Sequence, residues 1–209
     1  MTRDVVLLHG LWMNRLVMAP LARRLARAGF VPHAVTYRSV ARGLDDHVER
    51  VARLVDGLGA GRVHFVAHSM GGLVTAAYLE RARAGVADRV VLLGAPMAAC
   101  CAGREFAAHR AWRTALGASA DVWRGHRGHR LPEGVEAGAI AGTGRVGIGR
   151  FFVRLPEAND GVVMVSETRI PGLADHLVLP VSHSVMLLDD RVARETVHFL
   201  RHGRFSASR

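Results

Sequence analysis

The most constraining feature of this 209-residue chain is a short strand that passes into a helix across one serine and two glycines. Residues 63–67 (VHFVA) form an apolar run rich in β-branched and aromatic residues, which indicates a buried strand. Residues 73–83 (LVTAAYLERAR) place apolar side chains at helical spacing without a breaker, which predicts a helix. The chain must therefore reverse its direction within residues 68–72 (HSMGG).

A reversal this sharp constrains the backbone of Ser69. The residue at the apex is forced towards positive φ, and its neighbours must be small so that strand and helix can approach each other. Gly71 and Gly72 meet that requirement. The turn lifts the serine hydroxyl to the carboxyl end of a sheet, which is the geometry of a nucleophile elbow. An ordinary helix N-cap serine is the alternative, but the strand before and the helix after favour a catalytic serine.

The rest of the chain repeats the alternation of strand and helix. Further strands are expected at 4–8, 30–37, 88–93, 138–142 and 177–181, and further helices at 16–28, 44–58 and 191–201. This order predicts an α/β fold with a mostly parallel central sheet and helices on both faces. Such sheets bind ligands at the carboxyl ends of their strands.

Residues 97–135 interrupt the alternation and hold two of the three tryptophans. Partial helicity is expected around 104–116. The insertion over the sheet edge is either a small cap that contributes to substrate binding or a solvated surface excursion, and both alternatives stay open. Because nothing in the sequence resembles a linker, a single domain over residues 1–209 is expected.

The formal net charge of +10 raises the question of nucleic acid or an anionic membrane as a partner. All 28 basic residues are arginines, which indicates a coding bias, and they are scattered along the chain. We therefore expect no nucleic-acid partner. Weak contact with an anionic membrane or an acidic substrate is compatible with this charge.

Targeting and cofactor signals are weak. No apolar run is long enough to span a bilayer, and residues 5–8 are too few for a signal sequence, so a cytoplasmic protein is expected. The adjacent Cys100 and Cys101 lack the spacing of a zinc site and are expected to be reduced fillers. Residues 142–147 match Gly-x-Gly-x-x-Gly but open no helix near the first strand, which argues against a dinucleotide site. We expect no cofactor and no metal.

A serine hydroxyl becomes a nucleophile only when a base takes its proton, and a buried acid must orient that base. His183 follows the last predicted strand at its carboxyl end, where Ser69 also lies, whereas His176 begins that strand and belongs to the opposite rim. Asp160 precedes a glycine that allows a tight turn, and it is the predicted acid. Asp175 is its rival but adjoins His176.

Attack on an ester creates an oxyanion, which requires preorganised donors. Met70 follows the serine and offers its backbone N–H at a helix N-terminus. Gly10 lets the loop after the first strand approach closely, so the Leu11 N–H is the predicted second donor. Leu11, Trp12 and Met70 are expected near the floor of an apolar cleft, where Trp12 would bind substrate.

Four segments together resemble the α/β-hydrolase superfamily, namely residues 7–10 (LLHG), 67–72 (AHSMGG), 159–161 (NDG) and 181–183 (VSH). The elbow is similar to that of small lidless bacterial lipases and esterases, in which alanine also replaces the usual first glycine. The resemblance spans nearly the whole chain except the insertion. It implies Ser69, Asp160 and His183 as catalytic triad, with Leu11 and Met70 as oxyanion donors.

The resulting hypothesis is a serine hydrolase that cleaves carboxylic esters, of small molecules or lipids, through an acyl-enzyme. Acyl transfer and thioester or amide hydrolysis use the same triad, and sequence does not separate them. A ligand-binding protein that keeps the hydrolase fold with little turnover is the alternative outside catalysis. The complete serine, acid and histidine set argues against that alternative, because a pure binder has no need of all three. The sequence does not predict the oligomeric state.

Overall fold

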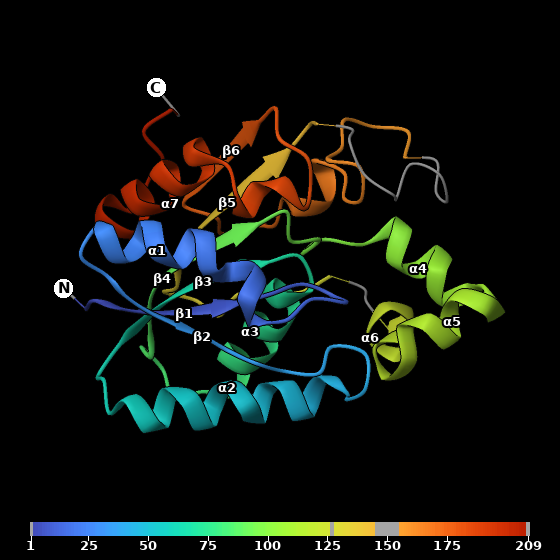
Figure 1. The fold of residues 1–209 in the computed structure, drawn as a ribbon, viewed down its shortest axis with the longest axis horizontal. Coiled ribbons are helices and arrows are strands. Elements are labelled where there is room, and N and C mark those ends of the chain that lie inside the picture. The colour runs from blue at the N-terminus through green and yellow to red at the C-terminus, as the bar shows by residue number, and fades with distance from the viewer. Residues whose placement is uncertain (1, 126–127, 145–154, 208–209) are drawn as a thin grey trace.

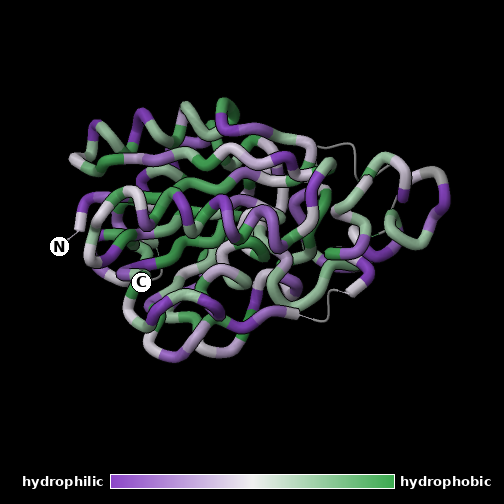
Figure 2. Tube along the Cα trace, turned by 90° about the horizontal axis from the view of Figure 1, so that it is seen from below, coloured by the Kyte–Doolittle hydropathy of each residue, from purple (hydrophilic) through white to green (hydrophobic). Residues whose placement is uncertain are grey.

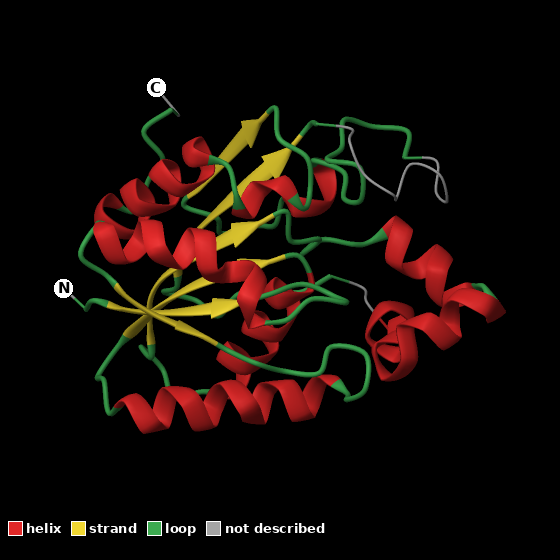
Figure 3. Cartoon of the chain, in the orientation of Figure 1, coloured by secondary structure: helices red, strands yellow, loops and turns green. Residues whose placement is uncertain are grey.

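The fold is built on one six-stranded sheet. The computed structural model describes residues 2–125, 128–144 and 155–207. The strand order is β2-β1-β3-β4-β5-β6, and every neighbouring pair is parallel (Figure 3). The strands are β1 (Asp4–Leu8), β2 (Val31–Ala34), β3 (Val63–His68), β4 (Ala87–Leu93), β5 (Glu136–Gly142) and β6 (Asp175–Leu179). The expected α/β architecture is confirmed.

Helices cover both faces of the sheet (Figure 1). The four large ones are α1 (Ala19–Arg27), α2 (Leu44–Leu58), α3 (Met70–Arg81) and α7 (Asp190–His202). Alternate residues of β1 enter different cores, because successive strand side chains point to opposite faces. Val5 packs in the core under α1 and α7, and Val6 packs in the core under α2 and α3. Figure 2 shows the hydrophobic strands inside and hydrophilic residues on the outer helix surfaces.

Prolines explain two boundaries that differ from the sequence prediction. The helix expected over 16–28 divides into a 3-10 turn, η1 (Arg15–Met18), and α1. Pro20 has no N–H to donate to the carbonyl four residues earlier and its ring clashes there, so a continuous α-helix is excluded. The last strand ends at Leu179 rather than at residue 181, since Pro180 follows it and cannot donate to a ladder.

Strand pairing and helix capping set the other boundaries. β2 covers only residues 31–34 of the expected 30–37. The Val35 N–H still donates to the Leu7 carbonyl at 3.0 Å, but β1 ends at Leu8, so the pairing stops there. α2 covers the predicted residues 44–58 and ends at Gly59, whose φ is +61°. α7 begins where the Asp189 side chain accepts hydrogen bonds from the N–H groups of Arg191 and Val192 and so caps the helix.

The strand order reverses beside β1. The chain passes from β1 to β2 on one side and returns through β3 on the other, so β1 and β3 flank a topological switch point. Ligands of open α/β sheets bind in the crevice outside the carboxyl ends of the strands at such a point. The loop after β1 and the turn after β3 therefore meet where chemistry is expected.

The insertion forms three short helices at the carboxyl edge of the sheet (Figure 1). They are α4 (Cys101–Ala108), α5 (Arg110–Leu116) and α6 (Ala120–Gly125), with a 3-10 turn, η2 (Gly117–Ser119), between the last two. Trp123 is buried against Gly103, and Leu116 belongs to the same core as α2 and α3. The segment thus packs on the domain rather than standing in solvent. Its role in substrate binding stays a prediction.

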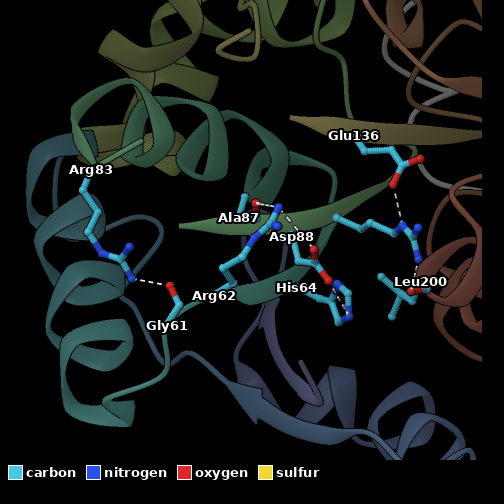
Figure 4. A network of polar contacts seen from close by, with 9 residues as sticks. Gly61, Arg62, His64, Arg83, Ala87, Asp88, Glu136 and Leu200 are labelled. Carbon is cyan, nitrogen blue, oxygen red and sulfur yellow. Dashed lines mark hydrogen bonds and ion pairs between the residues drawn. The ribbon is translucent and has the colours of Figure 1, made fainter. Parts of the chain in front are cut away.

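The amino edge of the sheet is closed by charged contacts (Figure 4). Arg62 and His64 both approach the Asp88 carboxylate, at 3.2 and 3.6 Å. Arg89 pairs with Glu136 and also donates to the Leu200 carbonyl of α7 at 2.9 Å. These contacts fix the starts of the central strands, which leaves the opposite edge for loops. Within the described ranges, none of the helices is both long and apolar enough to span a membrane.

The packing of α3 against the sheet gives a first prediction. A Cβ at Gly72 would lie 2.5 Å from the Ala95 Cβ, whereas a Cβ at Gly57 in α2 would meet no atom within 4 Å. We expect Gly72→Ala to destabilise the fold by about 1–3 kcal/mol through overpacking. Gly57→Ala should stabilise it by about 0.5–1 kcal/mol, since alanine is the better helix former. Urea unfolding measures both, and equal effects at the two sites would contradict this packing.

Candidate active site

Ser69 lies in a strained turn between β3 and α3. Its φ is 55° and its ψ is −126°, so the positive φ predicted for the apex is confirmed. The Ser69 N–H donates to the Leu93 carbonyl at the end of β4, at 2.9 Å. Its side chain makes no capping bond to α3, which disfavours the ordinary N-cap alternative. The hydroxyl is thus held at the carboxyl edge by the backbone and is free of a capping role.

Glycines let three segments converge on this turn. A Cβ at Gly71 would lie 2.7 Å from the Leu8 carbonyl oxygen, so α3 approaches the end of β1 without room for a side chain. A Cβ at Gly10 would lie 3.0 Å from the Ser69 Cβ. The loop after β1 therefore lies directly against the serine.

Asp160 and His183 form a buried pair, as predicted. The carboxylate Oδ2 lies 2.8 Å from the His183 Nδ1, and Oδ1 accepts from the N–H groups of Val162 and Val163 at 3.0 and 2.7 Å. The His183 N–H also donates to the Asp160 carbonyl at 2.9 Å. Since a carboxylate accepts, Nδ1 carries the proton and Nε2 keeps its lone pair. This is the tautomer that a general base at Nε2 requires.

Glycines also make room for this pair. Gly94, at the end of β4, has a φ of +53°, and a Cβ there would lie 3.0 Å from the Asp160 Oδ2 and 3.1 Å from the His183 Nδ1. Gly142 and Gly144 press against Val181, just before the histidine. The first residues of the Gly-x-Gly-x-x-Gly match therefore serve close packing beside His183. Residues 145–147 lie outside the described part of the chain.

His68, which sequence reasoning passed over, precedes Ser69 in the chain and contacts His183. The centroids of the His68 and His183 rings are 4.6 Å apart, and the His68 Nε2 lies 3.0 Å from the His183 carbonyl oxygen. Burial lowers the pKa of His68 to about 3, and the nearby His183 acts in the same direction. His68 is therefore neutral and donates its Nε2–H to that carbonyl. Its position before Ser69 places His183 beside the elbow.

The two predicted oxyanion donors, Met70 and Leu11, belong to the elbow and to the loop after β1. Met70 is the first residue of α3. Leu11 follows Gly10 and precedes Trp12, whose N–H donates to the Ser39 hydroxyl at 3.1 Å. The backbone directly after Leu11 is therefore held in place. The roles of Leu11 and Met70 stay predictions.

The surroundings of Trp12 differ from those expected at the floor of an apolar cleft. Its φ is 56°, its side chain is 54% exposed, and its indole Nε1–H donates to the Ala115 carbonyl of α5 at 2.9 Å. The indole thus bridges the loop after β1 and the insertion. The predicted role of Trp12 in substrate binding stays untested.

The rival residues lie elsewhere, as the sequence indicated. Asp175 begins β6 and accepts from the Phe205 N–H, and the neighbouring His176 Nε2 lies 2.8 Å from the Thr168 hydroxyl. Both belong to the amino end of their strand. His183 comes after the carboxyl end of the same strand, so the choice between the two histidines follows from strand direction.

Glu167 is a second residue that the sequence did not reveal. The residue is 3% exposed, and its carboxylate accepts from the Met164 N–H at 2.8 Å and from the Cys101 N–H at the start of α4. The Glu167 carbonyl accepts from the Ala98 N–H at 2.9 Å. No local pattern predicts a contact between residues 66 positions apart, so no sequence signal could have found it.

Two grooves on the helical faces do not coincide with this site. One, of about 490 Å³, lies between α1 and α7, and the other, of about 520 Å³, lies between α2 and α3. Neither is lined by Ser69, Asp160 or His183. Within the described ranges, no three histidine, cysteine or carboxylate side chains gather in a way that could hold a metal ion. Cys100 and Cys101 are free thiols.

Comparison with known proteins decides the family. The model described as "Alpha/beta hydrolase family" matches residues 5–203. The chain belongs to the alpha/beta hydrolase family. A comparison of this hydrolase with curated protein sequences gives no match.

Solved structures share the fold of this alpha/beta hydrolase at low identity. The mature lipase BlEst2 of Bacillus licheniformis is 16% identical with a TM-score of 0.70, over 97% of this chain and 92% of that one. A metagenomic carboxyl esterase is 19% identical with a TM-score of 0.68, over 88% and 65%. The carboxylesterase CesB of Bacillus subtilis is 15% identical with a TM-score of 0.58, over 97% and 84%. These likenesses establish the fold.

The buried, neutral His68 gives a prediction for stability against pH. Its pKa of about 3 in the folded state lies below the unfolded value of 6.5, so the unfolded chain binds more protons between these values. The stability that His68 contributes is complete above pH 6.5 and is lost as the pH falls. The loss is about 1.4 kcal/mol between pH 7.5 and 5.5.

Urea unfolding at pH 7.5 and 5.5 and constant ionic strength tests this. The free energy of unfolding should fall less steeply in His68→Phe than in the wild type, by about that 1.4 kcal/mol. The change between the two pH values is the readout, so a uniform loss of stability in the variant does not affect it. Equal pH dependence in both proteins would show that His68 is not held neutral.

Proposed function

We propose that this protein is a serine hydrolase that cleaves carboxylic esters through an acyl-enzyme on Ser69. The observation that carries the proposal is the buried Asp160–His183 pair at 2.8 Å, beside a serine in a strained turn between strand and helix. Membership of the alpha/beta hydrolase family supports the same reaction class. The named neighbours, a lipase and carboxylesterases, support an ester as the substrate.

In this proposal the His183 Nε2 takes the proton from the Ser69 hydroxyl as its oxygen attacks the ester carbonyl. Asp160 holds the Nδ1–H and stabilises the charged imidazole that forms. The C–O bond to the alcohol then breaks, and His183 returns the proton to that leaving oxygen. Water then attacks the acyl carbon while His183 takes one of its protons. The bond between the acyl carbon and the Ser69 oxygen breaks, His183 returns the proton to that oxygen, and the carboxylic acid leaves.

The negative oxygen of each tetrahedral intermediate needs donors that are already in place. The Met70 N–H at the start of α3 is one, and the positive end of the helix dipole adds to it. The Leu11 N–H is the other. Because Gly10 lies against Ser69 and the Trp12 N–H is held by Ser39, the Leu11 backbone is fixed before substrate arrives. No cofactor enters this mechanism.

A fluorophosphonate probe tests the nucleophile directly. The wild-type protein should form a covalent adduct at Ser69, because an activated serine displaces fluoride from the probe and becomes phosphonylated. Ser69→Ala should abolish the labelling, as measured by intact-protein mass spectrometry. Labelling that persists in Ser69→Ala would assign the activated group to another residue.

Exchanging the acid tests the pair. Asp160→Asn should lower kcat for p-nitrophenyl acetate by about 10³–10⁴-fold, because the amide favours the wrong tautomer of His183. KM should change by no more than about threefold, since the carboxylate does not touch the substrate. Asp175→Asn is the matched control on the opposite rim and should keep kcat within about threefold. A large loss of kcat in Asp175→Asn, with kcat nearly unchanged in Asp160→Asn, would instead identify Asp175 as the acid.

A further inference from the structure

Helices α4–α6 attach to two of the segments that carry the proposed catalytic groups. One attachment reaches the loop after β1, which holds Leu11, and the other reaches the loop that holds Asp160. In Figure 1 these helices lie at the carboxyl edge of the sheet, beside the ends of the central strands. A segment that only covered the substrate would not need bonds to both loops.

The first attachment is made by Trp12. Its indole N–H donates to the Ala115 carbonyl, 103 residues further along the chain, at 2.9 Å. A second contact strengthens this junction: the Ala118 N–H donates to the Val40 carbonyl at 2.8 Å, and Gly117 packs so closely on Val40 that no Cβ would fit. The insertion is therefore fixed to the loops after β1 and β2 at two places.

Trp12 also adopts a costly backbone conformation. A positive φ in a residue with a bulky side chain costs of the order of 1–3 kcal/mol, so surrounding contacts must hold it. Its N–H to Ser39 and its indole to Ala115 are two such contacts. The chain direction at Trp12 determines how the preceding Leu11 is presented to the elbow. Loss of the indole bond would release the conformation and with it the Leu11 N–H.

The second attachment is made by Glu167. Its buried carboxylate accepts from Cys101 at the start of α4 and from Met164, while Val163, the residue before Met164, donates its N–H to the Asp160 Oδ1. The acid loop is thus joined to α4 through one side chain. Movement of α4 would act on the hydrogen bonds that orient Asp160 towards His183.

We propose that α4–α6 position the proposed catalytic groups, with Trp12 and Glu167 as the positioning residues. Trp12 transmits the position of α5 to the oxyanion donor Leu11, and Glu167 transmits the position of α4 to Asp160. This inference rests on the proposed ester hydrolysis. It assigns the insertion an effect on the chemical step in addition to any contact with substrate.

Substrate length separates positioning from binding. The acetyl group of p-nitrophenyl acetate is too short to use a distant acyl pocket, whereas a palmitoyl chain would extend over the insertion. Loss of positioning must lower kcat for both esters alike, because the same groups act on both. Loss of a binding contact alone must raise KM for the palmitate and leave the acetate unchanged.

Trp12→Phe and Glu167→Gln are the two test variants. Phenylalanine keeps an aromatic ring but has no N–H that could donate to the Ala115 carbonyl. Glutamine keeps one acceptor and places an NH₂ group against the second backbone N–H. Glu195→Gln is the matched control, because Glu195 is also buried and its carboxylate also accepts two bonds, from the Ser206 N–H and hydroxyl, but within the C-terminal region.

Each test variant should lower kcat for both esters by about tenfold or more, with KM for the acetate within about twofold, while Glu195→Gln keeps wild-type kinetics. The thermal unfolding midpoint shows whether each variant folds. If the buried change Glu167→Gln prevents folding, the kinetics of Trp12→Phe, a change on the surface, decide the result. Unchanged kcat with the acetate in folded Trp12→Phe would overturn the inference. Absence of ester turnover in the wild type would instead refute the proposed function.

Discussion

The close packing of α3 on the ends of β1 and β4 is the constraint on which the site depends. Gly71 and Gly72 let this helix approach backbone and Cβ atoms at distances that no side chain allows. Ser69 must then turn the chain at once and adopt its positive φ, at a cost of the order of 1–3 kcal/mol. Residues 70–79 of the helix are buried throughout, and this burial offsets the strain.

One edge of the sheet holds contacts that stabilise the fold, and the opposite edge holds the candidate active site. At the amino edge, charged side chains such as Asp88 and Glu136 hold strand ends together in short, local contacts. At the carboxyl edge, loops meet through backbone hydrogen bonds and buried imidazoles. Burial lowers the pKa of His68, which keeps this ring neutral beside His183. A positive charge that forms on His183 during the proposed reaction therefore meets no cation at His68.

Local patterns were enough to predict most of the fold. Apolar runs located all six strands, and the helix over residues 44–58 has the expected bounds. Two of the boundary errors fell where proline removes a donor, at Pro20 and Pro180, although both residues are visible in the sequence. Periodicity alone extends an element across such a position, and the missing hydrogen bond ends it.

The sequence by itself determined the elbow at Ser69, the parallel sheet, and Asp160 and His183 as candidates, because backbone strain and strand direction leave local traces in residue type and order. Only the tertiary structure decided that Asp160 and His183 touch, that His68 bonds to His183, and that Trp12 and Glu167 join the insertion to the catalytic loops. These contacts join residues 23 to 115 positions apart. A single hydrogen bond between distant residues imposes no periodic pattern on either segment, so it can be known only once the chain has folded.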